Sequence, residues 1–111
     1  MSITVRYHRS TAEDINDWLE GMAQGDPIRR AHAELYFLEL AALLEQCGGP
    51  PPGAVREPGL SPPTYWWDYY PNLWIRFTIR EGPKKWLGPF GERERKITVV
   101  RVRDCPPGLA R

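Results

Sequence analysis

The stretch TYWWDYYPNLWIRFTIREG, residues 64–82, decides the fold because it contains two strands and the turn that joins them. Residues 64–70 are rich in aromatic side chains, and residues 73–80 alternate between apolar and polar ones; both patterns are typical of strands. Only Pro71 and Asn72 lie between the two segments. This short connection predicts an antiparallel hairpin.

The second strand of the hairpin is expected to present two different faces, since successive side chains of a strand point to opposite sides of the sheet. The face toward the core takes the apolar residues Leu73, Ile75, Phe77 and Ile79. The other face takes Trp74, Arg76, Thr78 and Arg80. We expect helices to cover the first face and to leave the second one open.

The segment after residue 9 predicts two helices. Ser10 and Glu13 have the spacing of a capping box, so the first helix is expected to begin there and to end at Gly25. Asp26 followed by a proline is a second start signal, for a helix that stops at the glycines of residues 48–49. The side of this helix that is expected to face the core carries the apolar stripe Ile28, Ala31, Leu35, Leu38 and Ala42.

Further strands are expected at residues 3–7 and 97–103, which alternate as residues 73–80 do. Residues 48–63 are rich in proline and glycine and predict a long surface connection. The predicted order is therefore β-α-α-β-β-β in one domain, residues 1–111. We expect an α+β fold, in which two N-terminal helices pack on one face of a mostly antiparallel sheet of about four strands.

The formal net charge of +1 conceals an asymmetry along the chain. Residues 10–47, which hold the predicted helices, carry eight acidic and two basic side chains, whereas the remaining residues carry 13 basic and six acidic ones. This division predicts an acidic helical layer and a basic sheet that faces an anionic partner. The alternative is that ion pairs between the two layers neutralise both.

Several classes of function have no motif in the sequence. No signal peptide and no run of about 18 apolar residues is present, which predicts a cytoplasmic protein without membrane contact. Cys47 and Cys105 lie far apart, and two reduced thiols are expected in preference to a disulfide. Motifs for zinc, for nucleotide phosphates and for hydrolase nucleophiles are absent, so an enzyme would have to work without a metal or cofactor.

The predicted open face gathers basic side chains from several strands. Its outward positions are expected to hold Arg6 and His8 from the first strand, and Arg101 and Arg103 from the last. Val100 and Val102 of the last strand are expected to point inward. Guanidinium groups bind phosphate by paired hydrogen bonds and aromatic rings stack on unpaired bases, so such a face suits RNA.

Less specific interpretations of the same residues stay open. Strand arginines on a solvated face often serve only to keep the sheet soluble. Tyr65, Trp67 and Tyr69 are expected to pack in the core or at an edge in preference to stacking on bases. A single histidine such as His8 is more often a surface residue than a general base.

The order and spacing of these segments resemble the RelE/ParE superfamily of toxins from bacterial type II toxin–antitoxin systems. The resemblance rests on ITVRYHRSTAEDINDWL at residues 3–19, LWIRFTIRE at residues 73–81 and ITVVRVRD at residues 97–104. It implies a compact endoribonuclease that cleaves mRNA at the ribosome or, in the ParE branch, an inhibitor of DNA gyrase. It also implies a partner, an antitoxin protein that neutralises the toxin.

The resemblance further implies site residues. In the ribonuclease branch, basic residues help the ribose 2′-OH to attack the adjacent phosphate and stabilise the charge that develops. The expected catalytic residues are Arg76, which would hold the scissile phosphate, Arg103 and His8, with Tyr70 as an alternative for proton transfer. The expected RNA-binding residues are Arg56, Trp74, Arg80, Lys84, Lys85 and Arg101.

The chain also departs from the pattern of this superfamily. The loop before the hairpin holds only Arg56 where a lysine-rich loop is expected, and no tyrosine follows Arg103. Catalysis is therefore expected either to use other residues or to be absent. The alternative function is a non-catalytic module that binds nucleic acid or an acidic protein segment.

Overall fold

The structure, a computed structural model, describes residues 2–84 and 93–107. Its elements in chain order are β1 (Ser2–Tyr7), α1 (Thr11–Ala23), α2 (Pro27–Cys47), β2 (Val55–Arg56), β3 (Thr64–Tyr70), β4 (Leu73–Lys84) and β5 (Arg93–Arg103). The tip of the predicted β4–β5 hairpin, which includes Lys85, lies outside the described residues. No helix in the described ranges is long and apolar enough to cross a membrane.

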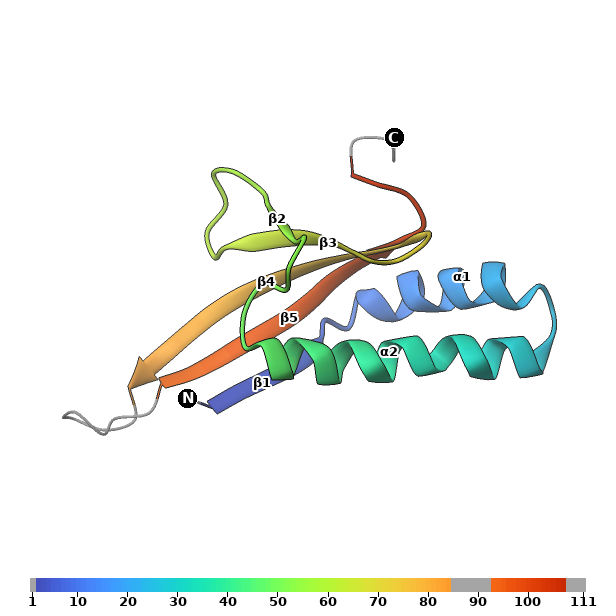
Figure 1. The fold of residues 1–111 in the computed structure, drawn as a ribbon, viewed down its shortest axis with the longest axis horizontal. Helices are drawn as coiled ribbons and strands as arrows, with labels where there is room; N and C mark the ends of the chain where they lie inside the picture. Colours follow the sequence, from blue (N-terminus) through green and yellow to red (C-terminus); the bar gives the residue numbers. More distant parts are fainter. Residues whose placement is uncertain (1, 85–92, 108–111) are drawn as a thin grey trace.

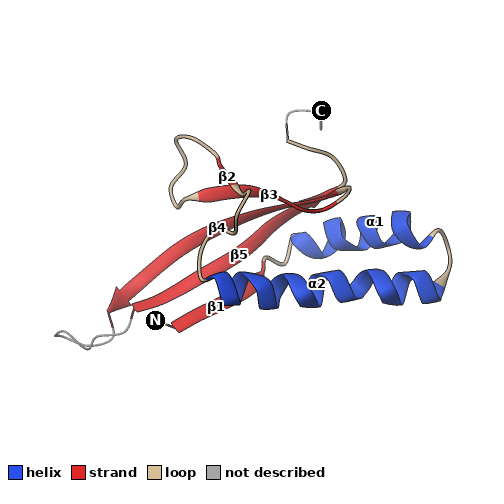
Figure 2. Cartoon of the chain, viewed as in Figure 1, coloured by secondary structure: helices blue, strands red, loops and turns tan. Residues whose placement is uncertain are grey.

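The sheet has the strand order β1-β5-β4-β3-β2, and both helices cover the same face of it (Figures 1 and 2). β1 runs parallel to β5, and the other neighbouring strands are antiparallel. The predicted α+β fold is therefore confirmed. The described residues form five strands, where about four were expected, because the loop predicted to be irregular contains β2, which pairs with Tyr65 and Trp66 of β3.

α1 begins after Ser10 without the predicted capping box. The side chain of Ser10 makes no cap hydrogen bond. Its backbone N–H donates to Nδ1 of His8 at 3.2 Å, and its Oγ lies 2.6 Å from the same nitrogen. The turn from β1 thus offers Ser10 a nearby partner, and the expected reciprocal bond with Glu13 is wrong. The helix ends at Ala23, followed by Gln24 in the left-handed conformation.

The predicted ends of α2 are confirmed. The side chain of Asp26 accepts a hydrogen bond from the backbone N–H of Ile28 at 2.9 Å, as an N-cap does. Gly48 ends the helix with a φ of 68°, a conformation that favours glycine. The backbone conformation is what favours glycine here, since a β-carbon would lie 2.8 Å from Cδ1 of Ile3, the end of a side chain that can move aside.

The apolar stripe that was predicted to face the core is on the outside of α2, so that prediction is wrong. The buried positions of the helix are Ala33, Phe37, Leu40 and Leu44. The exposed fraction of Leu40 is 0%, whereas that of Leu38 is 71%. α2 has apolar residues on two sides, and the side that carries Phe37 fills the space above the sheet.

Aromatic side chains join the helices to the sheet as expected. Trp18 of α1 packs edge-to-face against Phe37, with ring centres 5.5 Å apart, and its Nε1–H donates to the backbone oxygen of Asn72 at 2.7 Å. Tyr65 and Trp67 pack against the core, and Tyr69 donates its hydroxyl to a backbone oxygen of α2. The four inward residues predicted for β4, Leu73, Ile75, Phe77 and Ile79, are all buried.

A β-bulge in β5 changes which residues of this strand face the core. Arg76 pairs with Arg101, but the next residue of β4 pairs with Val99, so Val100 has no partner of its own. Val99 and Val102 are buried and Val100 is not. The prediction that Val100 points inward is therefore wrong, because the extra residue interrupts the alternation of the strand.

Candidate nucleic-acid interface

The face of the sheet away from the helices is called the open face. Strand register assigns it these side chains: Arg6, Lys96, Thr98, Arg101, Arg103, Trp74, Arg76, Thr78, Arg80, Thr64, Trp66 and Asp68. The predicted outward positions of β4 are all among them, and so are both arginines of the last strand. The open face is thus rich in basic and aromatic side chains, as the sequence indicated.

Arg76, expected to hold the scissile phosphate, is bound to Glu57. Its Nε donates to Oε1 at 2.7 Å and its Nη2 donates to Oε2 at 3.1 Å. The guanidinium carbon also lies 5.9 Å from the centre of the Trp66 ring, in range of a cation–π contact. Arginine binds phosphate with the same bidentate geometry. Two of the five N–H donors of Arg76 are therefore engaged by Glu57, whose carboxylate also offsets the positive charge that an external anion would meet.

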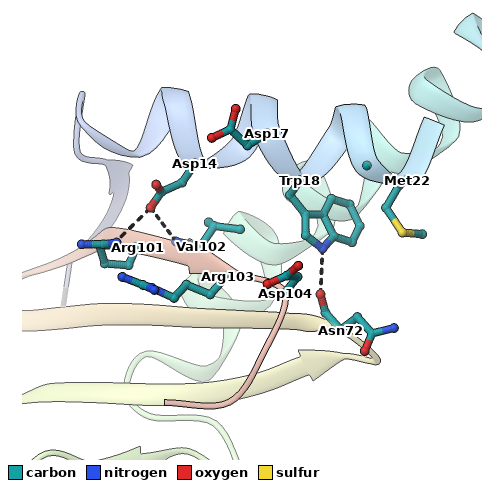
Figure 3. Close-up of a pocket in the computed structure, with 10 residues that line it drawn as sticks. Asp14, Asp17, Trp18, Met22, Asn72, Arg101, Val102, Arg103 and Asp104 are labelled. Carbon is teal, nitrogen blue, oxygen red and sulfur yellow. Dashed lines mark hydrogen bonds and ion pairs between the residues drawn. The ribbon is translucent and has the colours of Figure 1, made fainter. Parts of the chain in front are cut away.

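Arg101 and Arg103 line a cavity of about 500 Å³ between α1 and the end of β5 (Figure 3). The carboxylate of Asp14 in α1 accepts a hydrogen bond from the backbone N–H of Val102 at 3.1 Å. Nε of Arg101 lies 3.4 Å from the same carboxylate oxygen. Asp17 and Asp104 line the cavity as well. With three carboxylates and two guanidinium groups, it is a poor site for phosphate. The ion pair of Arg101 also shows that part of the opposite charge of the two layers is neutralised.

A second cavity, of about 590 Å³, lies on the open face and is called the basic pocket. It is lined by Arg6, Tyr7, His8, Arg9, Thr78, Arg80, Lys96, Thr98 and Val100. Four of these residues are arginine or lysine, and no carboxylate is among the described residues that line it. The pocket thus combines positive charge with two threonine hydroxyl groups.

Like charges face each other in the basic pocket. Arg80 of β4 pairs directly with Lys96 of β5, and Arg6 of β1 lies one row further along the sheet, opposite Thr98. Like charges at directly opposed strand positions destabilise a sheet. Within the described part of the chain, none of these three basic side chains has an ion pair. A bound anion would relieve their repulsion.

His8 stands at the rim of the basic pocket with one ring nitrogen already engaged. Its Nδ1 accepts the backbone N–H of Ser10, so in the neutral ring the proton is on Nε2. Among the described residues no hydrogen bond reaches Nε2. His8 is therefore placed to donate a hydrogen bond from Nε2 to a ligand in the pocket.

Two tyrosines are excluded from proton transfer in the basic pocket. The hydroxyl of Tyr7 points to the helix side and donates to the backbone oxygen of Phe37 at 2.6 Å. Burial raises the pKa of Tyr7 to about 12, so it stays protonated at neutral pH. Tyr70, the alternative to His8, pairs with Leu73 and packs against Tyr36 of α2, with ring centres 4.4 Å apart. Tyr70 is thus on the helix side of the sheet.

The structure brings together only part of the predicted RNA-binding set. Arg80 is in the basic pocket, and Trp74 is half-buried on the open face beside Asp68 and Arg103. Arg56 pairs with Tyr65, whose ring stacks on the buried Phe77, so the register assigns Arg56 to the helix side. Lys84 ends β4. Lys85 lies outside the described residues.

Three residues of the candidate site were missed by the sequence analysis. Lys96 lies two residues before Thr98 and therefore on the same face of β5. Extending the predicted strand toward its N-terminus would have included it. Arg9 directly follows His8 in the turn after β1 and had no periodic signal. Glu57 lies in a segment that was predicted to be an irregular loop, and nothing in the sequence indicated that it would meet Arg76.

The fold and these cavities define a small α+β protein with a basic pocket on an open sheet face. Comparison of the chain with family models, with curated proteins and with solved structures finds no match. In the described residues no group of three histidine, cysteine or acidic side chains could hold a metal ion. Cys47 and Cys105 are free thiols.

Proposed function

We propose that the protein binds single-stranded RNA across the open face and holds a phosphodiester in the basic pocket. The observation that carries this proposal is the direct pairing of Arg80 with Lys96 in a pocket that also holds Arg6, Arg9 and His8. Guanidinium and ammonium groups supply charge-assisted hydrogen bonds to phosphate oxygens, and the threonine hydroxyls supply further donors.

Aromatic side chains extend this site along the sheet. Trp74 lies on the same face of β4 as Thr78, four residues away, which corresponds to about 13 Å along the strand. Trp66 lies on the neighbouring strand, opposite Arg76. Stacking on such rings accepts any unpaired base. A single strand whose phosphate is held in the basic pocket would thus reach the two tryptophans with its neighbouring bases.

The activity we infer is metal-independent cleavage of mRNA, by a cytoplasmic toxin of the RelE/ParE type whose partners are the ribosome and an antitoxin. The ribose 2′-OH attacks the adjacent phosphorus and gives its proton to solvent water, the bond to the 5′ oxygen breaks, and a cyclic phosphate forms. His8 in its doubly protonated form passes the Nε2 proton to the departing 5′ oxygen and later regains one from solvent, and Arg80 and Lys96 stabilise the charge on the phosphate. Arg76 and Arg103 then serve RNA binding more than catalysis.

A second function, RNA binding without cleavage, is favoured by a different observation. Arg76 is bound to Glu57 and Arg101 to Asp14, so two of the arginines expected at a catalytic phosphate already hold carboxylates. A module that only binds RNA needs the basic pocket and the tryptophans, and no proton transfer.

Translation in a cell-free bacterial extract, followed by primer extension on the mRNA, separates the two functions. The wild-type protein is expected to cut ribosome-bound mRNA, His8→Ala to bind RNA without cutting it, and Arg80→Ala with Lys96→Ala to do neither. Arg56→Ala is the matched control, since it removes an exposed arginine from the other side of the sheet. Intact mRNA with tight RNA binding would favour the non-catalytic function, and absence of RNA binding would refute both.

A further inference from the structure

α2 carries a second apolar stripe, here called the outer seam: Ile28, Ala31, Leu35, Leu38 and Ala42. The exposed fractions of its large side chains are 68% for Ile28, 51% for Leu35 and 71% for Leu38. Single exposed apolar residues are common on protein surfaces. Here they follow one another along one side of a single helix, and no part of the described chain covers them.

The spacing of the outer seam is that of a coiled coil. Its residues are separated by three, four, three and four positions, so Ile28, Leu35 and Ala42 occupy heptad position a, and Ala31 and Leu38 occupy position d. The inner residues Ala33, Phe37, Leu40 and Leu44 have the same alternation and face the sheet, so what sets the outer seam apart is that it is exposed. The seam keeps its spacing from Ile28 to Ala42, and the next d position is Glu45. An exposed stripe with this spacing fits a partner helix.

We propose that the outer seam binds the outer seam of a second copy of this chain, with the two α2 helices antiparallel about a two-fold axis. In this arrangement Leu35 faces Leu38 of the second copy, and Ala31 faces Ala42. Residues 35 and 38 are centred on the same point of the sequence as residues 31 and 42. This point lies within one residue of the middle of α2. A single two-fold axis therefore satisfies both pairs with the helices fully overlapped, as an isologous interface requires.

The charges beside the outer seam favour the antiparallel arrangement. His32 and Glu39 flank one edge of the seam at heptad position e, and Glu34 flanks the other edge at position g; all three are exposed. In an antiparallel pair, position e of one helix faces position e of the other. An N–H of the His32 ring therefore faces the Glu39 carboxylate of the second copy. In a parallel pair position g faces e, and Glu34 would meet Glu39 with like charge.

Sedimentation velocity tests this self-association, which does not depend on RNA binding. The wild-type chain is expected to form a dimer with a Kd below about 1 mM. Leu38→Glu should raise this Kd at least tenfold. Because Leu38 is 71% exposed and glutamate is a good helix former, this variant should fold normally. Met22→Glu, at an exposed apolar position of α1, is the matched control and should dimerise as wild type does. A wild-type chain that stays monomeric to about 1 mM would overturn the proposal.

Cysteine cross-linking tests the orientation. With Cys47 and Cys105 replaced by serine, Ala31→Cys protein mixed with Ala42→Cys protein should cross-link under oxidation or with a short bis-maleimide, while each protein alone should not. Cross-linking of each protein with itself would indicate parallel helices and overturn the proposal. Absence of any cross-link, with a foreign helical protein bound to the seam instead, would also overturn it.

Discussion

The ion pair between Glu57 and Arg76 should restrain RNA binding, and Glu57→Gln tests this directly. Glutamine has nearly the shape of glutamate but lacks the charge, and it offers one acceptor oxygen where the carboxylate offers two. The exposed fractions of the two side chains are 31% for Arg76 and 28% for Glu57, so the pair is neither fully solvated nor buried. Removing the charge should loosen Arg76 and leave the surrounding strands in place.

The cost in stability should be moderate. An exposed ion pair contributes about 0.2–1 kcal/mol and breaking a fully buried one costs about 3–5 kcal/mol. For this half-exposed pair we expect Glu57→Gln to lower the free energy of unfolding by about 1–2 kcal/mol, because one of its two charge-assisted hydrogen bonds is lost. Urea titration followed by tryptophan fluorescence measures this change.

RNA affinity should change in the opposite direction. A released Arg76 gains one phosphate contact on the open face, which corresponds to about tenfold tighter binding and to a salt dependence steeper by about 0.7 in slope. Fluorescence anisotropy with a labelled single-stranded RNA at several salt concentrations measures both. Asp68→Asn removes a negative charge from the same face without releasing an arginine, so it isolates the effect of net charge.

A double-mutant cycle identifies Arg76 as the released group. In the Arg76→Ala background, Glu57→Gln should tighten RNA binding no more than Asp68→Asn does. Equal tightening with and without Arg76, or an unchanged stability of Glu57→Gln, would refute the conclusion that this ion pair restrains an RNA-binding arginine.

Three further predictions concern the fold and are measured by urea unfolding at concentrations where the chain is monomeric. Leu40→Ala should destabilise by about 2–5 kcal/mol and Leu38→Ala by less than about 0.5 kcal/mol, and the reverse order would contradict the assignment of the inner face of α2. Asp26→Ala should lower the free energy of unfolding by about 1 kcal/mol, because the N-cap of α2 is lost. A comparable decrease in Ser10→Ala would mean that the side chain of Ser10 caps α1. Tyr7→Phe should cost about 1 kcal/mol at pH 7, since a hydrogen bond to α2 is lost. The pKa of Tyr7 is raised from 10 in the unfolded chain to about 12 in the folded protein, so the unfolded chain loses this proton at lower pH. The free energy of unfolding of the wild type should therefore fall between pH 10 and 12. An equally steep fall in Tyr7→Phe would contradict this cause.

The strands of the central hairpin could be predicted because their signal is local. The alternation of residues 73–80 determines which side chains share a face, whatever lies above that face. Two strong turn residues also fixed the pairing of residues 64–70 with this strand. The same alternation failed at Val100, because a bulge depends on the partner strand and leaves no mark in the sequence of β5 alone.

The inner face of α2 could not be chosen from apolar residues alone, since both sides of the helix carry them. The spacing does not separate the two sides either, because Ala33, Phe37, Leu40 and Leu44 alternate by four and three positions just as the outer seam does. The large ring of Phe37 also fits a space between layers better than the smaller residues of the outer seam.

The candidate site was predictable to the extent that it follows strand alternation. Arg80 and His8 were both predicted on the open face, where they line the basic pocket, and Lys96 could have been added by the same rule. The partner of Arg76 could not be predicted, because Glu57 reaches it only through the pairing of β2 with β3. A long-range ion pair of this kind depends on tertiary structure, and it determines which arginine side chains already hold a carboxylate.

The central claim, that the basic pocket holds an RNA phosphate, is tested most directly by the salt dependence of RNA binding. Two doubly substituted proteins remove the same charge: Arg80→Ala with Lys96→Ala from the basic pocket, and Arg29→Ala with Arg56→Ala from the helix side. The first should bind single-stranded RNA at least tenfold more weakly, with a salt slope shallower by about 1.4, and the second should bind as the wild type does. Equal losses in both proteins would contradict a phosphate site in the basic pocket.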